Sequence, residues 1–165
     1  MADPRGADEI EYDRVFRGAA PAEFKLDWNG RTPERLEPSD VAKLDGEIRG
    51  ALSAMQFPQK IGGAMMQDAL DDARTFVNLD ENGQSLWDAQ QRANLARIVG
   101  PDRIEEAVSN ARVMLSMMKP ELRKELIDAG LFRSSRVILE LHMQAERWLA
   151  RADMADKRAA KAGTS

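Results

Sequence analysis

The stretch that decides the fold is ELRKELIDAGLFRSSRVILELH, residues 121–142. It contains two helical patterns joined by a tight turn, with Pro120 opening the first helix and Gly130 closing it. The turn itself is apolar at Leu131 and Phe132. A helix-turn-helix of this kind can read DNA, close the core of a bundle or offer a docking surface. We interpret Gly130, Leu131 and Phe132 as a structural turn whose apolar side chains pack between the two helices.

The charge of this unit argues against DNA reading. A recognition helix needs cations that meet phosphates, but its first turns carry Arg136 alone, with Arg133 just before it. Apolar side chains such as Val137 and Leu141 crowd the surface that would face the bases. The whole chain has a net charge of −4, whereas nucleic-acid binding favours a basic surface. We therefore rank a DNA-binding regulator below a protein-interaction role and expect no nucleic-acid partner.

Composition restricts the chemistry further. The 165 residues suffice for one domain and include no cysteine, which excludes disulfides and thiolate metal sites. The single histidine, His142, is interpreted as a surface or interface residue, since a catalytic triad or histidine metal cluster lacks its other members. We expect no enzyme activity and no cofactor. No apolar run approaches the roughly 18–20 residues of a membrane span, so a cytosolic protein is expected.

Apolar spacing predicts further helices on either side of the opening stretch. Gly62 and Gly63 lie in one of them and either permit close approach of another backbone or mark a kink. Two adjacent methionine pairs require wide apolar stripes, which favours helices covered on two sides, as in a homo-oligomer. The sequence thus predicts an all-α fold with five or six helices in an open bundle. The predicted helices are residues 40–55, 58–77, 85–99, 101–119, 120–129 and 135–154, and the pairs are Met65-Met66 and Met117-Met118.

The two ends of the chain are predicted to differ from this bundle. Residues 1–20 are charged and aperiodic, which is typical of a mobile tail. Phe24, Leu26 and Trp28 then alternate with polar residues, which predicts an extended arm laid on the chain's own helices or on another chain. The resulting division is a tail and extended arm at 1–38, a helical domain at 39–153 and a frayed basic tail at 154–165.

Two acidic clusters resemble metal sites but lack essential ligands. The loop NLDENGQSLWDA at 78–89 has Asn and Ala where a calcium-binding loop needs its first Asp and last Glu. Carboxylates at 68, 71, 72, 105 and 106 lie on two predicted helices, without the Glu-x-x-His motif of a dimetal centre. We interpret the first as a turn between helices and the second as solvated surface, and we expect no metal.

Charge is distributed unevenly along the chain. Residues 1–50 hold 8 basic and 12 acidic residues, whereas residues 141–165 hold 5 basic and 3 acidic ones. Arg147, Arg151 and Arg158 fall on one face of the last predicted helix, where they are either a solvated helix end or a docking surface for an acidic partner. The partner-binding candidates are Arg147, Trp148, Arg151, Lys157, Arg158 and Lys161, with Phe24, Leu26 and Trp28 of the arm.

The order of these features resembles the short capsid-assembly, scaffolding-like proteins of tailed bacteriophages. The arm AEFKLDW corresponds to their extended aromatic segment, and SDVAKLDGEIRGALSAMQFPQKIGGAMMQDAL to the helix pair that follows. Residues 100–149 correspond to their closing unit, with ELIDAGLFRSSRVILEL the best-matching part. The chain departs from the family pattern at FRSS, in place of Asn-x-Pro, and at IVG, in place of Trp-Gly.

The resemblance implies a function in assembly. Such a protein would bind the major capsid (coat) protein, or another virion protein, transiently through helical surfaces and its basic C-terminal tail. It would act in the host cytoplasm on the assembling phage particle. A permanent structural virion component, internal or associated with the connector, is the alternative implied by the same resemblance.

Overall fold

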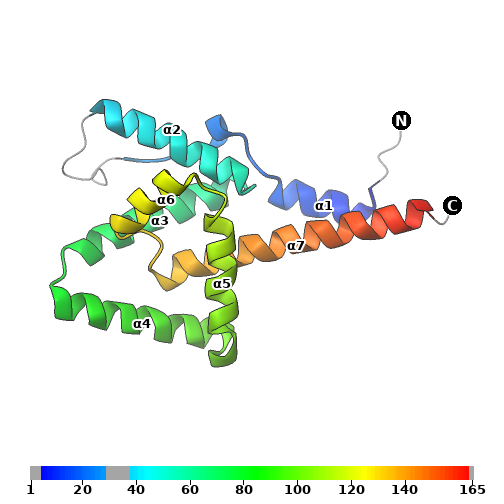
Figure 1. Cartoon of the computed structure of the whole chain (residues 1–165). Helices are drawn as coiled ribbons and strands as arrows, with labels where there is room; N and C mark the ends of the chain where they lie inside the picture. Colours follow the sequence, from blue (N-terminus) through cyan, green and yellow to red (C-terminus); the bar gives the residue numbers. More distant parts are fainter. Residues whose placement is uncertain (1–4, 29–37, 164–165) are drawn as a thin grey trace.

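The computed structural model describes residues 5–28 and 38–163, and this part of the chain is all-α, with no strand (Figure 1). Residues 1–4, 29–37 and 164–165, which belong to the predicted tail, arm and frayed end, lie outside the described residues. The described elements are α1 (Ala7–Phe16), the 3-10 turn η1 (Pro21–Glu23), α2 (Pro38–Ala54), α3 (Gln59–Val77), α4 (Glu81–Val99), η2 (Pro101–Arg103), α5 (Ile104–Leu115), α6 (Pro120–Asp128) and α7 (Ser135–Gly163).

The main core lies where α2, α3, α5, α6 and the first half of α7 meet. Each helix contributes an apolar stripe at helical spacing, as the sequence predicted. α5 and α7 form the most extensive helix pair. A smaller cluster joins α4 to α5 through Leu95, Ile104 and Ala107. Representative buried side chains of the main core are Ile48, Leu52, Met65, Met66, Met114, Leu122, Leu126, Val137 and Leu141.

The two glycines of α3 let the arm approach closely, as their sequence position predicted. A Cβ on Gly62 would lie 2.7 Å from Cε1 of Phe24, and one on Gly63 would lie 3.2 Å from the carbonyl oxygen of Lys25. The Phe24 ring is therefore packed over α3 and is 1% exposed. Residues 24–28 have no regular secondary structure and follow η1 across this surface.

The turn between α6 and α7 has two residues in the left-handed region. Gly130 has φ 91° and Phe132 has φ 68°. The first needs glycine, whereas the second is an uncommon conformation for a large side chain. Leu131 and Phe132 are both buried in the main core, so the turn packs inward and directs α7 across α5.

Both ends of the chain contain more helix than the sequence predicted. The described residues form seven α-helices instead of five or six, because residues 7–16, expected to lack structure, form α1. Asp8 and Glu9 lie in its first turn, where their negative charge stabilises the helix by interacting with the positive end of its dipole. Residues 154–163, expected to fray, continue α7 to Gly163. Alanine is the best helix former, and the pair between Lys157 and Asp153 adds support on the exposed face.

Figure 1 shows the consequence of these additions. The second half of α7 projects from the helical body, and α1 lies beside it, so that the two ends of the described chain are at the same end of the molecule. We call α1 and residues 146–163 of α7 the arm pair, which is distinct from the predicted extended arm that contains Phe24, Leu26 and Trp28. None of the helices within residues 5–28 and 38–163 is long and apolar enough to span a membrane.

Candidate interaction surface on the last helix

The start of α7 is fixed by side chains that satisfy its first backbone groups. The hydroxyl of Ser134 accepts a hydrogen bond from the amide of Val137 at 3.3 Å, which is the geometry of an N-cap. Ser135 donates its amide and its hydroxyl to Gln91 Oε1 of α4, at 2.9 and 3.0 Å. α7 thus starts at a defined point and runs across the core at a fixed angle.

The middle of α7 closes the end of α2. Gln144 Nε2 donates to the carbonyl oxygens of Met55 and Gln56, at 2.9 and 3.0 Å. Trp148 Nε1 donates to the same Met55 carbonyl at 2.9 Å. These carbonyls follow the last turn of α2 and have no helical partner, so the two side chains act as a remote cap. Trp148, predicted to contact a partner, is half-buried against the chain's own core.

Next to Trp148 and beyond it, three arginines of α7 turn toward α1. The guanidinium carbon of Arg147 lies 5.3 Å from the centre of the Phe16 ring, within the range of a cation–π contact. Arg151 donates to the carbonyl oxygen of Phe16, and its Nε lies 3.6 Å from Asp13 Oδ1. Arg158 Nη1 donates to Glu9 Oε1 at 2.6 Å. The three predicted binding arginines therefore share one face, and that face is occupied by α1.

Burial distinguishes Arg147 from the other two arginines. Its guanidinium is held between Phe16 and Gln144, whose Oε1 accepts from Arg147 Nε at 2.7 Å. Burial lowers the pKa of Arg147, an effect that the Glu140 carboxylate opposes. Burial also raises the pKa of the Glu140 carboxyl. Among the described residues, Arg147 Nη2 and Glu140 Oε2 are buried without a hydrogen-bond partner. The Arg147 guanidinium and the Glu140 carboxylate thus each keep one buried polar atom without a hydrogen bond.

The remaining predicted contact residues lie in two places, near the end of α7 and in the segment at residues 24–28. Lys157 is exposed on α7 and pairs with Asp153 at 2.9 Å, and Lys161 is exposed one turn further on. Leu26 and Trp28 pack half-buried against the main core, and Trp28 Nε1 donates to Asp45 Oδ1 at 2.8 Å. Together with the buried Phe24, these two residues bind the segment to α2 and α3. The structure does not bring them near the arginines of α7.

The cations of the helix-turn-helix are engaged within the chain. Arg133 pairs with Asp88 at 2.9 Å and its guanidinium carbon lies 4.3 Å from the centre of the Phe76 ring. Arg136 donates to both oxygens of Asp72, at 3.0 and 2.7 Å, and lies 3.2 Å from Asp68. Both cations that a DNA-reading role would place near phosphates thus have carboxylate partners on α3 or α4.

His142 is buried, in contrast to the surface position considered from the sequence. It is 4% exposed between α5 and α7. Its Nε2 lies 3.0 Å from Glu146 Oε1, and its Nδ1 lies 3.0 Å from Asn110 Nδ2. A carboxylate accepts, so Nε2 carries the proton and Nδ1 accepts from the amide in the neutral ring. This arrangement joins α5 to α7 and places no nucleophile beside the imidazole.

The acidic clusters also have structural partners. Asp80 is the N-cap of α4, where its carboxylate accepts from the amide of Gly83 at 2.7 Å, so residues 78–81 connect two helices. Glu105 pairs with Arg92 at 2.8 Å and Glu106 with Arg103 at 2.9 Å. Across residues 5–28 and 38–163, no three histidine or carboxylate side chains are grouped so that they could hold a metal ion.

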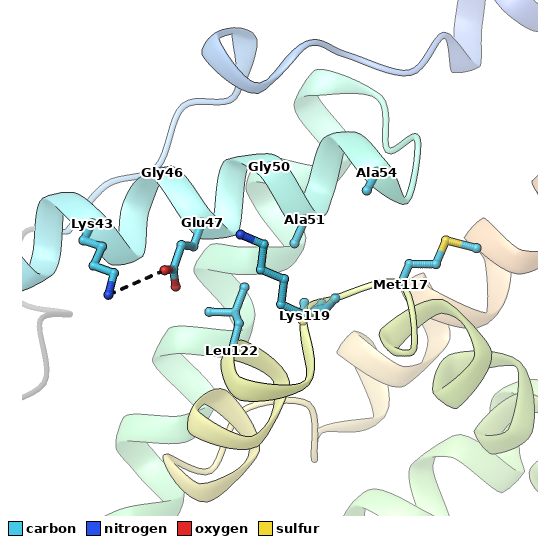
Figure 2. Close-up of a pocket in the computed structure, with 10 residues that line it drawn as sticks. Lys43, Gly46, Glu47, Gly50, Ala51, Ala54, Met117, Lys119 and Leu122 are labelled. Carbon is cyan, nitrogen blue, oxygen red and sulfur yellow. Dashed lines mark ion pairs between the residues drawn. The ribbon is translucent and has the colours of Figure 1, made fainter.

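A groove of about 450 Å³ lies between α2 and the start of α6 (Figure 2). Small residues of α2, including Gly46 and Gly50, form one wall, and Met117 stands opposite. Figure 2 shows the ends of Lys43 and Glu47 turned toward each other at one side, and they lie 4.0 Å apart. The titratable side chains that line the groove are Lys43, Glu47 and Lys119.

Comparison of the chain with protein-family models, curated proteins and solved structures gave no significant match. Any statement about function therefore rests on features of the chain itself. The main feature that sequence analysis missed is α1, which has no apolar stripe. The available signal was charge: residues 7–16 hold four acidic residues and one basic residue, opposite the basic end of α7.

Proposed function

We propose that this chain is a capsid-assembly, scaffolding-like protein of a tailed bacteriophage, which binds coat subunits transiently and acts on the assembling particle in the host cytoplasm. The observation that carries the proposal is the arm pair. The second half of a long amphipathic helix projects from the packed body (Figure 1), and three of its arginines share one face, which α1 covers. Such a projecting helix suits docking to another protein better than it suits catalysis, for which a concave site with convergent reactive groups is typical.

Weak contacts would be sufficient for this function. A solvated pair between an arginine of α7 and a carboxylate of a coat subunit contributes about 0–1 kcal/mol, so one copy binds reversibly. Many copies on one growing shell, or a self-associated form of the chain, would sum such contacts through effective concentration. Raised salt would weaken each pair, because the screening length falls to about 8 Å near physiological ionic strength.

The test combines the chain with the coat protein of its own genome and measures shell yield and size by electron microscopy and sedimentation. Deletion of residues 154–165 should abolish co-assembly while the body stays folded, because the deleted residues contribute no side chain to the core. The deletion also removes the pair between Arg158 and Glu9. Glu9→Gln is therefore the matched control, since it breaks the same pair and keeps the tail, and it should still co-assemble.

Three outcomes would contradict parts of the proposal. Normal shells from the deletion variant would exclude the tail from coat binding. Absence of any complex between the intact chain and the coat protein would overturn the assembly function itself. Retention of the intact chain on DNA at low salt, with release at high salt, would favour a nucleic-acid role instead.

A further inference from the structure

α1 is attached to the molecule differently from every other described helix. None of its residues is buried, and its backbone approaches that of α7 at fewer places than the backbones of α3, α4 and α5 do. It is held by the ends of long side chains: the pair between Arg158 and Glu9, the pair between Arg151 and Asp13, and the stacking of Arg147 on Phe16. α1 therefore lies on α7 through these polar contacts and two half-buried rings, Tyr12 and Phe16, and has no fully buried side chain.

Such an attachment opens readily. An isolated helix shorter than about 12 residues is marginal in water, so α1, with ten residues, depends on α7 to stay helical. A partly exposed ion pair changes an equilibrium by only about one- to fivefold. The side chain of Arg158 is 41% exposed and that of Arg151 is 24% exposed. A segment held by a few such contacts belongs to the low-stability end of a fold.

The pivot for opening is also defined. Beyond α1, the amide of Ala19 donates to the carbonyl oxygen of Phe57 at 3.0 Å, and Ala19 and Phe24 are buried. The chain is thus fixed to the body at residues 19–24. Arg17, the residue that ends α1, is extended, with φ −58° and ψ 131°. Rotation at Arg17 and Gly18 would release α1 and leave the body intact.

The surface beneath α1 has a specific chemistry. Arg147, Arg151 and Arg158 follow one face of α7, and Met154 and Ala155, half-buried, lie on the same face at helical spacing. Arg147 Nη2 is buried and has no hydrogen-bond acceptor among the described residues. Release of α1 would expose three cations along an apolar seam about three turns long.

The contacts that α1 makes indicate which chemical groups fit this surface. Its contacts come from two carboxylates four residues apart, Glu9 and Asp13, and from an aromatic ring three residues later, Phe16. We propose that α1 is a displaceable cover, and that the exposed face of α7 binds an acidic amphipathic helix of a partner protein with the same spacing of carboxylates and aromatic ring. The location of that helix in a coat subunit rests on the proposed function, whereas the exchange of helices does not.

Hydrogen exchange of the full chain tests the opening. Glu9→Gln should accelerate exchange in residues 7–16 by about two- to fivefold, because one pair with α7 is lost. Glu11→Gln is the matched control, since it removes the same charge from α1 but Glu11 pairs with Arg14 of the same helix. Glu11→Gln should leave the exchange rate of residues 7–16 unchanged. The exchange rate of residues 38–150 should be unchanged in both variants. Equal acceleration by the two variants, or none by Glu9→Gln, would overturn the cover.

A peptide of residues 5–17, labelled with a fluorophore, tests the surface. It should bind the opened full-length variant Glu9→Gln/Asp13→Asn more tightly than the parent, whose own α1 competes at high effective concentration. The same peptide with Glu9→Gln and Asp13→Asn should bind more weakly than the acidic peptide, by up to about 25-fold, since each of the two contacts changes the equilibrium by about one- to fivefold. Equal binding of the two peptides would overturn the requirement for an acidic helix.

A cross-link provides the closed state. The chain has no cysteine, and the side-chain ends of Glu9 and Arg158 are 2.6 Å apart, so Glu9→Cys/Arg158→Cys can be bridged by a flexible bis-maleimide. The bridged protein should not bind the peptide, whereas the same variant with each thiol capped separately should. Binding to the bridged form would place the peptide elsewhere. Concentration-dependent dimers of the opened variant, suppressed by the bridge, would overturn the partner helix in favour of α1 exchange between two copies.

These outcomes are separable from those of the proposed function. Failure of the peptide and exchange experiments, with coat co-assembly intact, would remove the cover and keep the assembly function. Success of both, without any coat complex, would keep the exchangeable helix and require a different acidic partner.

Discussion

Replacement of Gly62 by alanine tests how the N-terminal segment is bound to the body. Gly62 lies in the first turns of α3, where alanine would ordinarily favour the helix by about 1 kcal/mol. A Cβ at this position would lie 2.7 Å from Cε1 of Phe24 and 2.9 Å from Cβ of Phe57. Carbon atoms attract at about 3.5–4.0 Å, so both separations are strongly repulsive. We expect Gly62→Ala to destabilise the fold.

The magnitude follows from the mobility of the two neighbours. Phe24 is 1% exposed and Phe57 is 0% exposed, so neither has free space into which it can move. Overpacking of a core costs about 1–3 kcal/mol, and the helical preference of alanine offsets about 1 kcal/mol of this. The net loss in unfolding free energy is about 0–2 kcal/mol. The closest contact involves a ring in a filled core, which favours the upper part of that range.

Gly46→Ala is the matched control, because a Cβ at Gly46 of α2 would have no heavy atom within 4 Å. It should stabilise the protein by about 0.5–1 kcal/mol through helix propensity alone. Thermal unfolding followed by circular dichroism resolves the two variants, since 1 kcal/mol shifts Tm by about 2–4 °C in a chain of this size. The Tm values should fall on opposite sides of the parent's. A Tm for Gly62→Ala raised above that of the parent, as expected for Gly46→Ala, would refute the close packing of Phe24 on α3.

Three further changes have defined expectations. Phe132→Ala should lower the unfolding free energy by about 3–5 kcal/mol, since the ring is buried. Phe132→Gly should lose about 1 kcal/mol less, because φ is 68°; chemical denaturation compares the two. Gln144→Leu should cost about 1–3 kcal/mol by leaving the carbonyl group of Gln56 unpaired, while Trp148 still donates to that of Met55; retained Tm would exclude the contribution of Gln144 to the remote cap. Glu140→Gln should raise Tm at pH 7, and the gain should vanish in a pH series below about pH 4; a constant gain would exclude the carboxyl as its source.

The sign of the Glu140 effect follows from the direction of its shift. Burial raises the pKa of this carboxyl above its ordinary value of 4.5. The folded state therefore binds the proton more tightly than the unfolded state, and stability falls as pH rises from the ordinary pKa through the raised one. A neutral amide removes that loss at neutral pH, and makes no difference where the carboxyl is protonated in both states.

The helical elements were predictable because they bury stripes. In α2, α3, α5, α6 and the first half of α7, apolar side chains recur every three or four residues, and glycine or proline marks most of the boundaries, so periodicity and local chemistry locate these helices. Helix α4 differs, since only its Leu95 is buried. The inward turn at Leu131 and Phe132 was predictable for the same reason, because apolar side chains in a short connection have few places to go except the core.

Helix α1 was not predictable in this way. Its register carries no apolar stripe, and its stabilising partners lie far away in the sequence: Arg158 and Glu9 are 149 positions apart. The same distance explains why the arginines of α7 could be placed on one face from the sequence, whereas their partner could not be identified. Periodicity reports which side of a helix is distinct, but not what lies against it.

The sequence by itself determined that this protein is helical and where most of its helices begin and end, since both depend on residues within a few turns of one another. Only the tertiary structure decided that α1 covers the arginines of α7, that Phe24 fills the space over Gly62, and that His142 is enclosed between α5 and α7. Each of these contacts joins segments distant in the chain. Their geometry depends on how the helices cross, which is set by packing of the whole core rather than by any local pattern.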